Sequence, residues 1–183
     1  MAEKRALEKR SIPILYSADE IRERIGEMAH DIASAMGGNF LIVSLLRGSF
    51  MFTADLVREL YATGVHPEID FMTLSSYGEG TASSGNVIIN RDLSDEVKGK
   101  KILIVDDILE TGRTLQFALE LLKERGAEDI KICMLLEKPG KLHVNVKADF
   151  VGFHIPDKFV VGYGLDHANH YRELPFIGYL DTH

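Results

Sequence analysis

Hydrophobic runs of strand length alternate with segments of helical periodicity along most of the chain. The runs that predict strands cover residues 40–46, 68–74, 102–105, 130–136, 148–153 and 158–161. Continuous apolar runs of this kind are typical of parallel strands that are covered on both faces. The alternation therefore predicts an α/β domain with a mostly parallel, twisted sheet flanked by helices.

Three segments have the apolar spacing of amphipathic helices. Ser17 followed by Glu20 is a capping-box pattern, which marks the expected start of the first helix. Gly64 and Gly126 mark the expected ends of the second and third helices. The three apolar faces consist of Ile21, Ile25, Met28, Ala29 and Ile32; of Phe52, Leu56, Val57 and Leu60; and of Leu115, Ala118, Leu119 and Leu122.

The composition is that of one ordinary globular domain. The chain has 183 residues, of which 45% are hydrophobic and 27% charged, and we expect a single domain over residues 1–183. The formal net charge of −7 disfavours a general nucleic-acid or membrane-surface binder. The one cysteine, Cys133, excludes an intramolecular disulfide. We recognise no signal peptide and no apolar run long enough for a membrane span, so we expect a cytoplasmic protein.

The segment 101–114, KILIVDDILETGRT, places polar chemistry at the end of a predicted strand. Asp106 and Asp107 follow the apolar run directly, and Glu110 follows in the turn. Carboxylates there can hold ribose hydroxyls and Mg²⁺. The amides and hydroxyls of residues 111–114 can bind a phosphate, because a helix N-terminus favours anions. A solvated acidic turn is the alternative interpretation.

The run VDDILETGRT resembles the 5-phosphoribosyl-1-pyrophosphate (PRPP) motif of the type I phosphoribosyltransferases. That motif consists of two acidic residues after a strand and a Thr-Gly-x-Thr loop. The resemblance implies the type I phosphoribosyltransferase fold, with a small hood and a flexible lid loop. Glu110 stands where most members of the family carry an aspartate that is proposed to take the N7 proton of the purine. The residues implied for PRPP binding are Asp106, Asp107, Thr111, Gly112, Arg113 and Thr114, and the first two are also implied metal ligands.

Two segments upstream fit the same family. Arg47 and Gly48 stand at a strand–helix junction, where open α/β sheets bind ligands. By resemblance, they belong to the loop that grips pyrophosphate, often through a non-proline cis peptide after Leu46. Residues 76–86 would form the lid, with Ser76 and Tyr77 near its base, to shield the reacting ribose from water. An exposed arginine in a turn and an ordinary surface loop are the plainer alternatives.

The segment 151–166, VGFHIPDKFVVGYGLD, and the YREL run after it resemble the hypoxanthine and hypoxanthine-guanine phosphoribosyltransferases. The resemblance implies that Lys138 donates to the purine 6-oxo group and that Phe159 stacks on the base. The backbone at Val160 would then meet the 2-position edge of the purine. Taken singly, Lys138 could be a solvated loop cation, and Phe159 could be a core residue.

The resemblance also covers two charged residues near the C-terminus. Asp166 would bind a second Mg²⁺, and Arg172 would contact pyrophosphate. An ion pair between them at the surface is the plainer alternative, and such a pair would contribute little. The hood would be formed by about residues 138–183 together with the N-terminal segment.

Together these features imply a purine salvage enzyme that transfers the 5-phosphoribosyl group of PRPP to hypoxanthine, and also to guanine. The products would be IMP or GMP and pyrophosphate, the cofactor Mg²⁺, and the assembly a homodimer or homotetramer. Two alternatives stay open: a xanthine-preferring transferase, and an RNA-binding regulator on the same fold, as in the pyrimidine-operon attenuation proteins. The regulator is not expected to carry the segment 158–172, and an RNA-binding face would need clustered basic residues, which are dispersed here.

Overall fold

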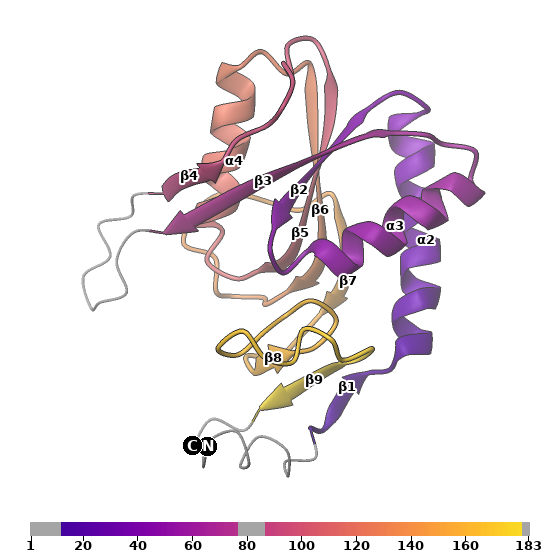
Figure 1. Cartoon of the computed structure of the whole chain (residues 1–183), viewed down its shortest axis with the longest axis vertical. Helices are drawn as coiled ribbons and strands as arrows, with labels where there is room; N and C mark the ends of the chain where they lie inside the picture. Colours follow the sequence, from indigo (N-terminus) through magenta and orange to yellow (C-terminus); the bar gives the residue numbers. More distant parts are fainter. Residues whose placement is uncertain (1–11, 77–86, 181–183) are drawn as a thin grey trace.

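The computed structural model describes residues 12–76 and 87–180, which form two sheets of unequal size (Figure 1). The strands of the larger sheet lie in the spatial order β4 (Val87–Arg91), β3 (Glu68–Ser76), β2 (Leu41–Leu46), β5 (Lys101–Leu109), β6 (Asp129–Glu137) and β7 (Phe150–His154). Only β4 is antiparallel to its neighbour; the other neighbouring strands are parallel. The predicted α/β fold with a mostly parallel sheet is confirmed.

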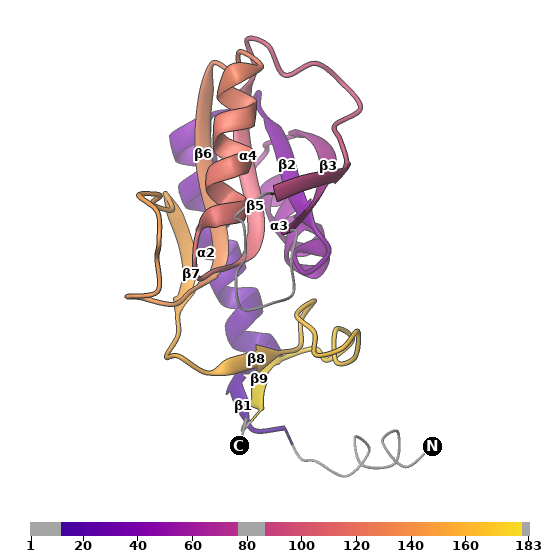
Figure 2. The same cartoon turned by 90° about the vertical axis from the view of Figure 1, so that its left-hand side faces the viewer.

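Helices cover both faces of this sheet, with α2 (Ala18–Met36) and α3 (Phe50–Ala62) on one face and α4 (Arg113–Glu124) on the other (Figures 1 and 2). Successive side chains of a strand point to opposite faces of the sheet, and so pack in different hydrophobic clusters. On β5, Leu103 and Val105 pack with α2 and α3, whereas Ile102 and Ile104 pack with α4. Because both faces are covered, the central strands carry apolar side chains on both faces, which explains their hydrophobic runs.

The ends of the helices follow the local signals in the sequence. The capping box of α2 is present: Glu20 N–H donates to Ser17 Oγ at 3.3 Å, and Ser17 N–H donates to Glu20 Oε2 at 2.8 Å. Gly64 and Gly126 both follow a helix at a φ of 81°, a left-handed conformation that glycine adopts without steric cost.

The smaller sheet is antiparallel and consists of β1 (Ile14–Tyr16), β9 (Ile177–Leu180) and β8 (Phe159–Val161), in that order. It lies beyond the carboxyl ends of the larger sheet's strands (Figures 1 and 2). The hood was expected to begin near residue 138, but β7 lies at the edge of the larger sheet. The smaller sheet therefore takes its C-terminal strands only from residues after His154.

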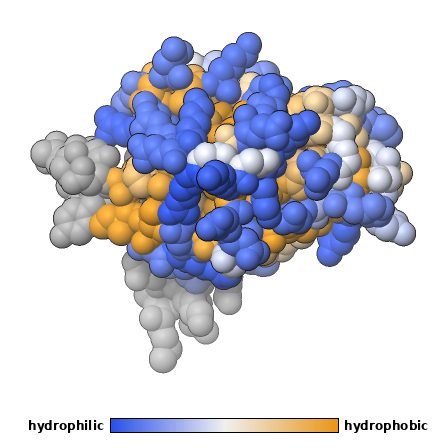
Figure 3. Space-filling model, turned by 90° about the horizontal axis from the view of Figure 1, so that it is seen from above, coloured by the Kyte–Doolittle hydropathy of each residue, from blue (hydrophilic) through white to orange (hydrophobic). Residues whose placement is uncertain are grey.

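The end of the molecule away from the smaller sheet is covered mainly by hydrophilic residues, with smaller hydrophobic areas between them (Figure 3). Within residues 12–76 and 87–180, no helix is both long and apolar enough to cross a membrane.

Candidate active site

Three adjacent parallel strands bring the predicted site residues to one edge of the larger sheet. β2, β5 and β6 are neighbours, so the segments that follow them meet at their common carboxyl ends. These segments begin with Arg47 after β2, Glu110 after β5 and Lys138 after β6. In open α/β sheets this edge is the usual place for a ligand, and here the smaller sheet faces it (Figure 2).

The acid pair lies inside strand β5 and not after it. The apolar run suggested a strand that ended at Val105, but the ladder with β6 continues through Asp106 to Leu109. Backbone pairing sets the end of a strand in an interior ladder, and it does not require apolar side chains. Asp107 N–H donates to Asp106 Oδ1 at 2.8 Å, and Ile108 N–H donates to Asp107 Oδ1 at 2.6 Å.

The electrostatics of the acid pair favour a nearby cation. Burial raises the pKa of Asp106 well above its ordinary value, and the neighbouring Asp107 carboxylate adds to this. Burial also raises the pKa of Asp107, although the amide of Ile108 and the charge of Arg172 partly oppose the rise. A cation placed beside the pair would stabilise both ionised carboxylates.

The loop after β2 touches the acid pair. The peptide bond between Leu46 and Arg47 is cis, as the resemblance implied. Gly48 is packed so tightly that a Cβ there would overlap the carboxylate of Asp107. A side chain at this position would displace either the loop or the Asp107 carboxylate, so glycine suits the close approach of this loop to β5.

Arg172 joins the C-terminal loop to the same edge. Its Nη2 lies 2.6 Å from Asp166 Oδ1, and its Nη1 donates to the carbonyl oxygen of Gly164 at 2.6 Å. The ion pair between Asp166 and Arg172, which was the plainer alternative from the sequence, is present in the structure. The pair is half-buried and its arginine also lowers the pKa of Asp107, so it lies within the site and is not a remote surface pair.

Glu110 and Lys138 face one another across the ends of β5 and β6. The side chain of Lys138 is buried, with the residue 7% exposed, and its Nζ lies 3.2 Å from Glu110 Oε1. Asp157 Oδ1 lies 3.9 Å from the same Nζ, and Asp157 also pairs with Lys141 at 2.6 Å. The interpretation of Lys138 as a solvated loop cation is wrong.

Phe159 and its neighbour Val160 have opposite environments. Phe159 begins β8 and is 40% exposed, with its ring edge-on to His167 at a centroid distance of 5.3 Å. Val160 is buried in the core. An exposed aromatic ring in a short strand is available to stack on a ligand, and the core interpretation of Phe159 is wrong.

The Thr-Gly-x-Thr loop leads into α4 as the sequence indicated. Gly112 occupies the N-cap position with a φ of 78°, and Arg113 and Thr114 begin the helix. A Cβ on Gly112 would overlap the side chain of Val144. Thr111 is exposed beside the helix start, where backbone amides favour an anion.

Ser76 ends β3, whereas Tyr77 and the rest of the predicted lid, residues 77–86, lie outside the described residues.

Two elements of the site escaped the sequence interpretation. No role was inferred from the sequence for the Gly162-Tyr163-Gly164 run itself, yet a Cβ on Gly164 would overlap the carbonyl oxygen of Gly48. The paired glycines around a tyrosine were the available signal. Asp157 was missed because a single acidic residue beside Lys158 has no distinctive local pattern.

Comparisons with known proteins show which family the chain belongs to. The family model described as a phosphoribosyl transferase domain matches residues 14–168. The hypoxanthine phosphoribosyltransferase of Escherichia coli (strain K12) is 46% identical over 173 residues, which cover 93% of this chain and 96% of that protein.

Solved structures agree as well. A hypoxanthine phosphoribosyltransferase from Staphylococcus aureus has a TM-score of 0.85 and 41% identity, over 91% of this chain and 90% of that one. The enzyme of the same kind from Trypanosoma cruzi has a TM-score of 0.88 and 38% identity, over 94% and 93%.

The chain therefore belongs to the phosphoribosyltransferase family and has its type I fold. Within that family it is an enzyme of the hypoxanthine phosphoribosyltransferase type, which acts in purine salvage. The RNA-binding regulator considered from the sequence is not favoured.

Proposed function

We propose that this enzyme transfers the 5-phosphoribosyl group of PRPP to hypoxanthine and to guanine, with release of pyrophosphate. The observation that carries the choice of base is the buried ammonium group of Lys138. An ammonium group has only donors, so it suits the 6-oxo acceptor of these purines and opposes the 6-amino group of adenine. The exposed ring of Phe159 supports stacking on the same base.

Each charged group at the sheet edge has a proposed part in the displacement at the anomeric carbon. Asp106 and Asp107 would stabilise the positive charge that grows on the ribose in a transition state resembling an oxocarbenium ion. Glu110 would accept the N7 proton of the purine, since a carboxylate within hydrogen-bond reach can act as a general base. The contact between Glu110 and Lys138 supports the proposal that both groups act on the same ligand.

The pyrophosphate is proposed to lie between the loop after β2 and the C-terminal loop. Arg47, Gly48 and Arg172 come together there, through the contact of Gly48 with Asp107 and the bonds of Arg172 to Gly164 and Asp166. The start of α4, residues 111–114, would hold the 5-phosphate of PRPP. Thr111 and Arg113 are both exposed on that side of the helix, as a phosphate-binding turn requires.

The acid pair fits Mg²⁺. Protein-bound Mg²⁺ is usually held by one or two carboxylates together with substrate phosphates and water, rather than by a complete protein cage. Asp106 and Asp107 supply such oxygens, and their raised pKa values mark a place where positive charge is favourable. We propose Asp166 for a second ion, which requires it to keep a free oxygen beside Arg172. When bound, Mg²⁺ would neutralise charge on the leaving pyrophosphate.

We extend the proposal to a cytoplasmic homodimer or homotetramer. Cys133 is buried and unpaired, which suits a reducing compartment. Large apolar side chains are exposed on α3, β3 and β4, namely Phe50, Tyr61, Ile69 and Ile88. Exposed apolar surface of this kind often marks a protein interface, and light scattering after size-exclusion chromatography would measure the assembly.

Initial rates of the purified protein with PRPP, Mg²⁺ and each of hypoxanthine, guanine, xanthine and adenine test the proposal. Hypoxanthine and guanine should be used far better than adenine. A clear preference for xanthine would support the xanthine-specific alternative, and comparable use of adenine would show that Lys138 does not read the 6-position.

A further inference from the structure

Tyr163 links the C-terminal loop to helix α3. It lies between Gly162 and Gly164, is only 7% exposed, and has a φ of 50°, a conformation that non-glycine residues seldom adopt. Its hydroxyl donates to Asp55 Oδ2 on α3 at 2.5 Å. The other carboxylate oxygen of Asp55 accepts from Arg58 at 2.7 Å, so the acceptor is itself oriented.

On the side of the C-terminal loop, the backbone next to Tyr163 holds Arg172. Tyr163 N–H donates to the Leu174 carbonyl at 2.9 Å, and Gly164 N–H donates to the Arg172 carbonyl at 3.0 Å. The Gly164 carbonyl then accepts from Arg172 Nη1 at 2.6 Å. A shift of Tyr163 would therefore move both the backbone and the guanidinium group of Arg172.

On the other side, α3 carries the loop that contains Gly48. The helix begins at Phe50, directly after this loop, and buried hydroxyls fasten it to β2. Ser44 Oγ lies 2.9 Å from Ser49 Oγ and 2.8 Å from Thr53 Oγ1. Asp55 is thus fixed relative to the loop after β2, and the backbone of Gly164 packs against the Gly48 carbonyl. Figures 1 and 2 show the segment between β8 and β9 lying below the start of α3.

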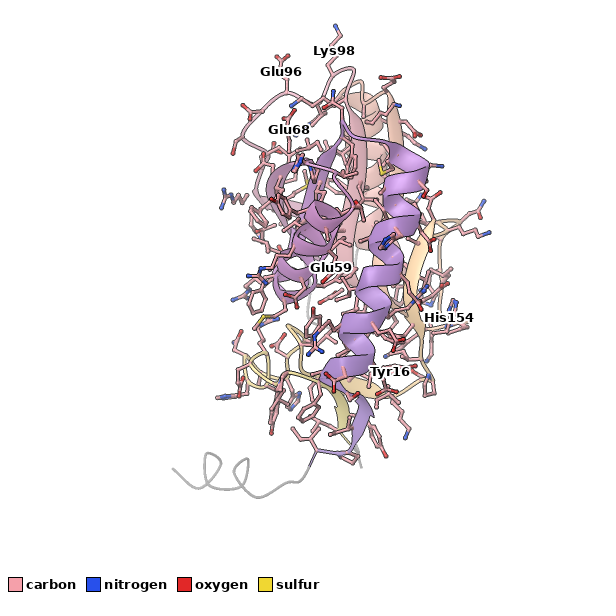
Figure 4. The ribbon with its side chains drawn as sticks, turned by 90° about the vertical axis from the view of Figure 1, so that its right-hand side faces the viewer. Tyr16, Glu59, Glu68, Glu96, Lys98 and His154 are labelled. Atoms are coloured by element: carbon pink, nitrogen blue, oxygen red, sulfur yellow. The ribbon has the colours of Figure 1, made fainter. Side chains whose placement is uncertain are left out.

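Close packing does not surround Tyr163. A cavity of about 400 Å³ lies beside it, between α2, α3 and residues 173–175, and it is also lined by Met51 and Asp55. Figure 4 shows Glu59, another lining residue, on α3 where that helix faces α2. Because Tyr163 lines this cavity, the hydrogen bond to Asp55 helps to fix the position of its hydroxyl.

We infer, on the basis of the function proposed above, that Tyr163 and Asp55 are positioning residues that hold Arg172 and Gly48 in place for pyrophosphate. Neither side chain needs to touch the substrate. The hydroxyl acts as a permanent donor, since burial and the Asp55 carboxylate raise the pKa of Tyr163 far above its ordinary value. Loss of the hydrogen bond between Tyr163 and Asp55 should weaken the binding of PRPP and pyrophosphate. The binding of the purine should not change, because Lys138 and Phe159 are the residues proposed to hold it.

Tyr163→Phe removes the hydroxyl and leaves the ring. We expect the Kd for PRPP with Mg²⁺, measured by calorimetry, and the KM for pyrophosphate in the reverse reaction to rise about tenfold, which corresponds to about 1.4 kcal/mol. The KM for hypoxanthine should stay within about twofold. Tyr16→Phe is the matched control, because the Tyr16 hydroxyl, on β1 of the smaller sheet, makes a long bond of 3.4 Å to the carbonyl of His154 at the end of β7.

Variants of Asp55 provide a second, independent test of the inference. Asp55→Ala should reproduce the effect of Tyr163→Phe, and the double variant should be no worse than either single one, because both remove the same link. Asp55→Asn keeps an acceptor oxygen and should restore part of the affinity.

Unchanged binding of PRPP and pyrophosphate in Tyr163→Phe, or equal losses for PRPP and purine with a lower Tm, would overturn the inference. Calorimetry with PRPP does not depend on which purine is used. A wild-type enzyme that binds PRPP but ignores hypoxanthine would therefore contradict the proposed function and leave this test intact.

Discussion

The ammonium group of Lys138 lies 3.2 Å from the carboxylate of Glu110, at the ends of the adjacent strands β5 and β6. The group proposed to read the 6-oxo position of the purine therefore already faces the group proposed to take its N7 proton. The ion pair gives each residue a partner before the base enters, and a purine must then satisfy both of them.

Glu110→Gln should lower kcat by about 10²-fold or more, the scale for loss of a general base. The amide oxygen can still accept from Lys138, so the fold and the Kd for PRPP should change little. Glu110→Asp, which keeps the carboxylate, should retain substantial activity in the same steady-state assay. Near wild-type turnover by Glu110→Gln would place the base elsewhere.

Lys138→Ala should weaken the use of hypoxanthine by about 1.5–3 kcal/mol in kcat/KM, the range for a hydrogen bond to a charged group. Lys141→Ala is the matched control, since Lys141 is in the same loop, pairs with Asp157 at 2.6 Å and has a side chain 43% exposed. The control should stay close to wild type. Equal losses in both variants would indicate a general disturbance of the loop.

Phe159→Leu should raise the KM for hypoxanthine more than the KM for PRPP, because the ring is proposed to stack on the base only. The residue is 40% exposed, so little core packing is lost and Tm should hardly move. Equal rises in both KM values with a clear fall in Tm would favour a packing role.

Gly48→Ala should lower kcat/KM for PRPP by about tenfold or more, since overpacking typically costs 1–3 kcal/mol. The new Cβ would overlap the Asp107 carboxylate and push the loop away from β5. Gly38→Ala is the control, because a Cβ there meets nothing within 4 Å. Wild-type kinetics in Gly48→Ala would show that the loop adjusts without consequence for the site.

Removal of divalent metal with EDTA should abolish turnover, and added Mg²⁺ should restore it. Burial raises the pKa of both Asp106 and Asp107, so a bound cation would stabilise their ionised forms. Turnover at the full rate in chelator would contradict the metal-dependent mechanism.

The sequence by itself determined the elements and the chemical groups of this protein. Apolar runs such as Ile102–Val105 and the helical spacing of Leu115, Ala118 and Leu122 are local consequences of burial, and they are readable because each element has its own period. The capping box at Ser17 and the glycines after the helices are also local sequence signals, and they predicted the ends of the helices. The acid pair and the Thr-Gly-x-Thr loop were recognised because their residues are contiguous.

Only the tertiary structure decided which of these groups meet. The contact of Gly48 with Gly164 and the bond of Tyr163 to Asp55 depend on how the smaller sheet sits on the larger one. The strand order places Glu110 beside Lys138. Such contacts join segments far apart in sequence and arise from the packing of whole elements, so no local pattern of residues carries them.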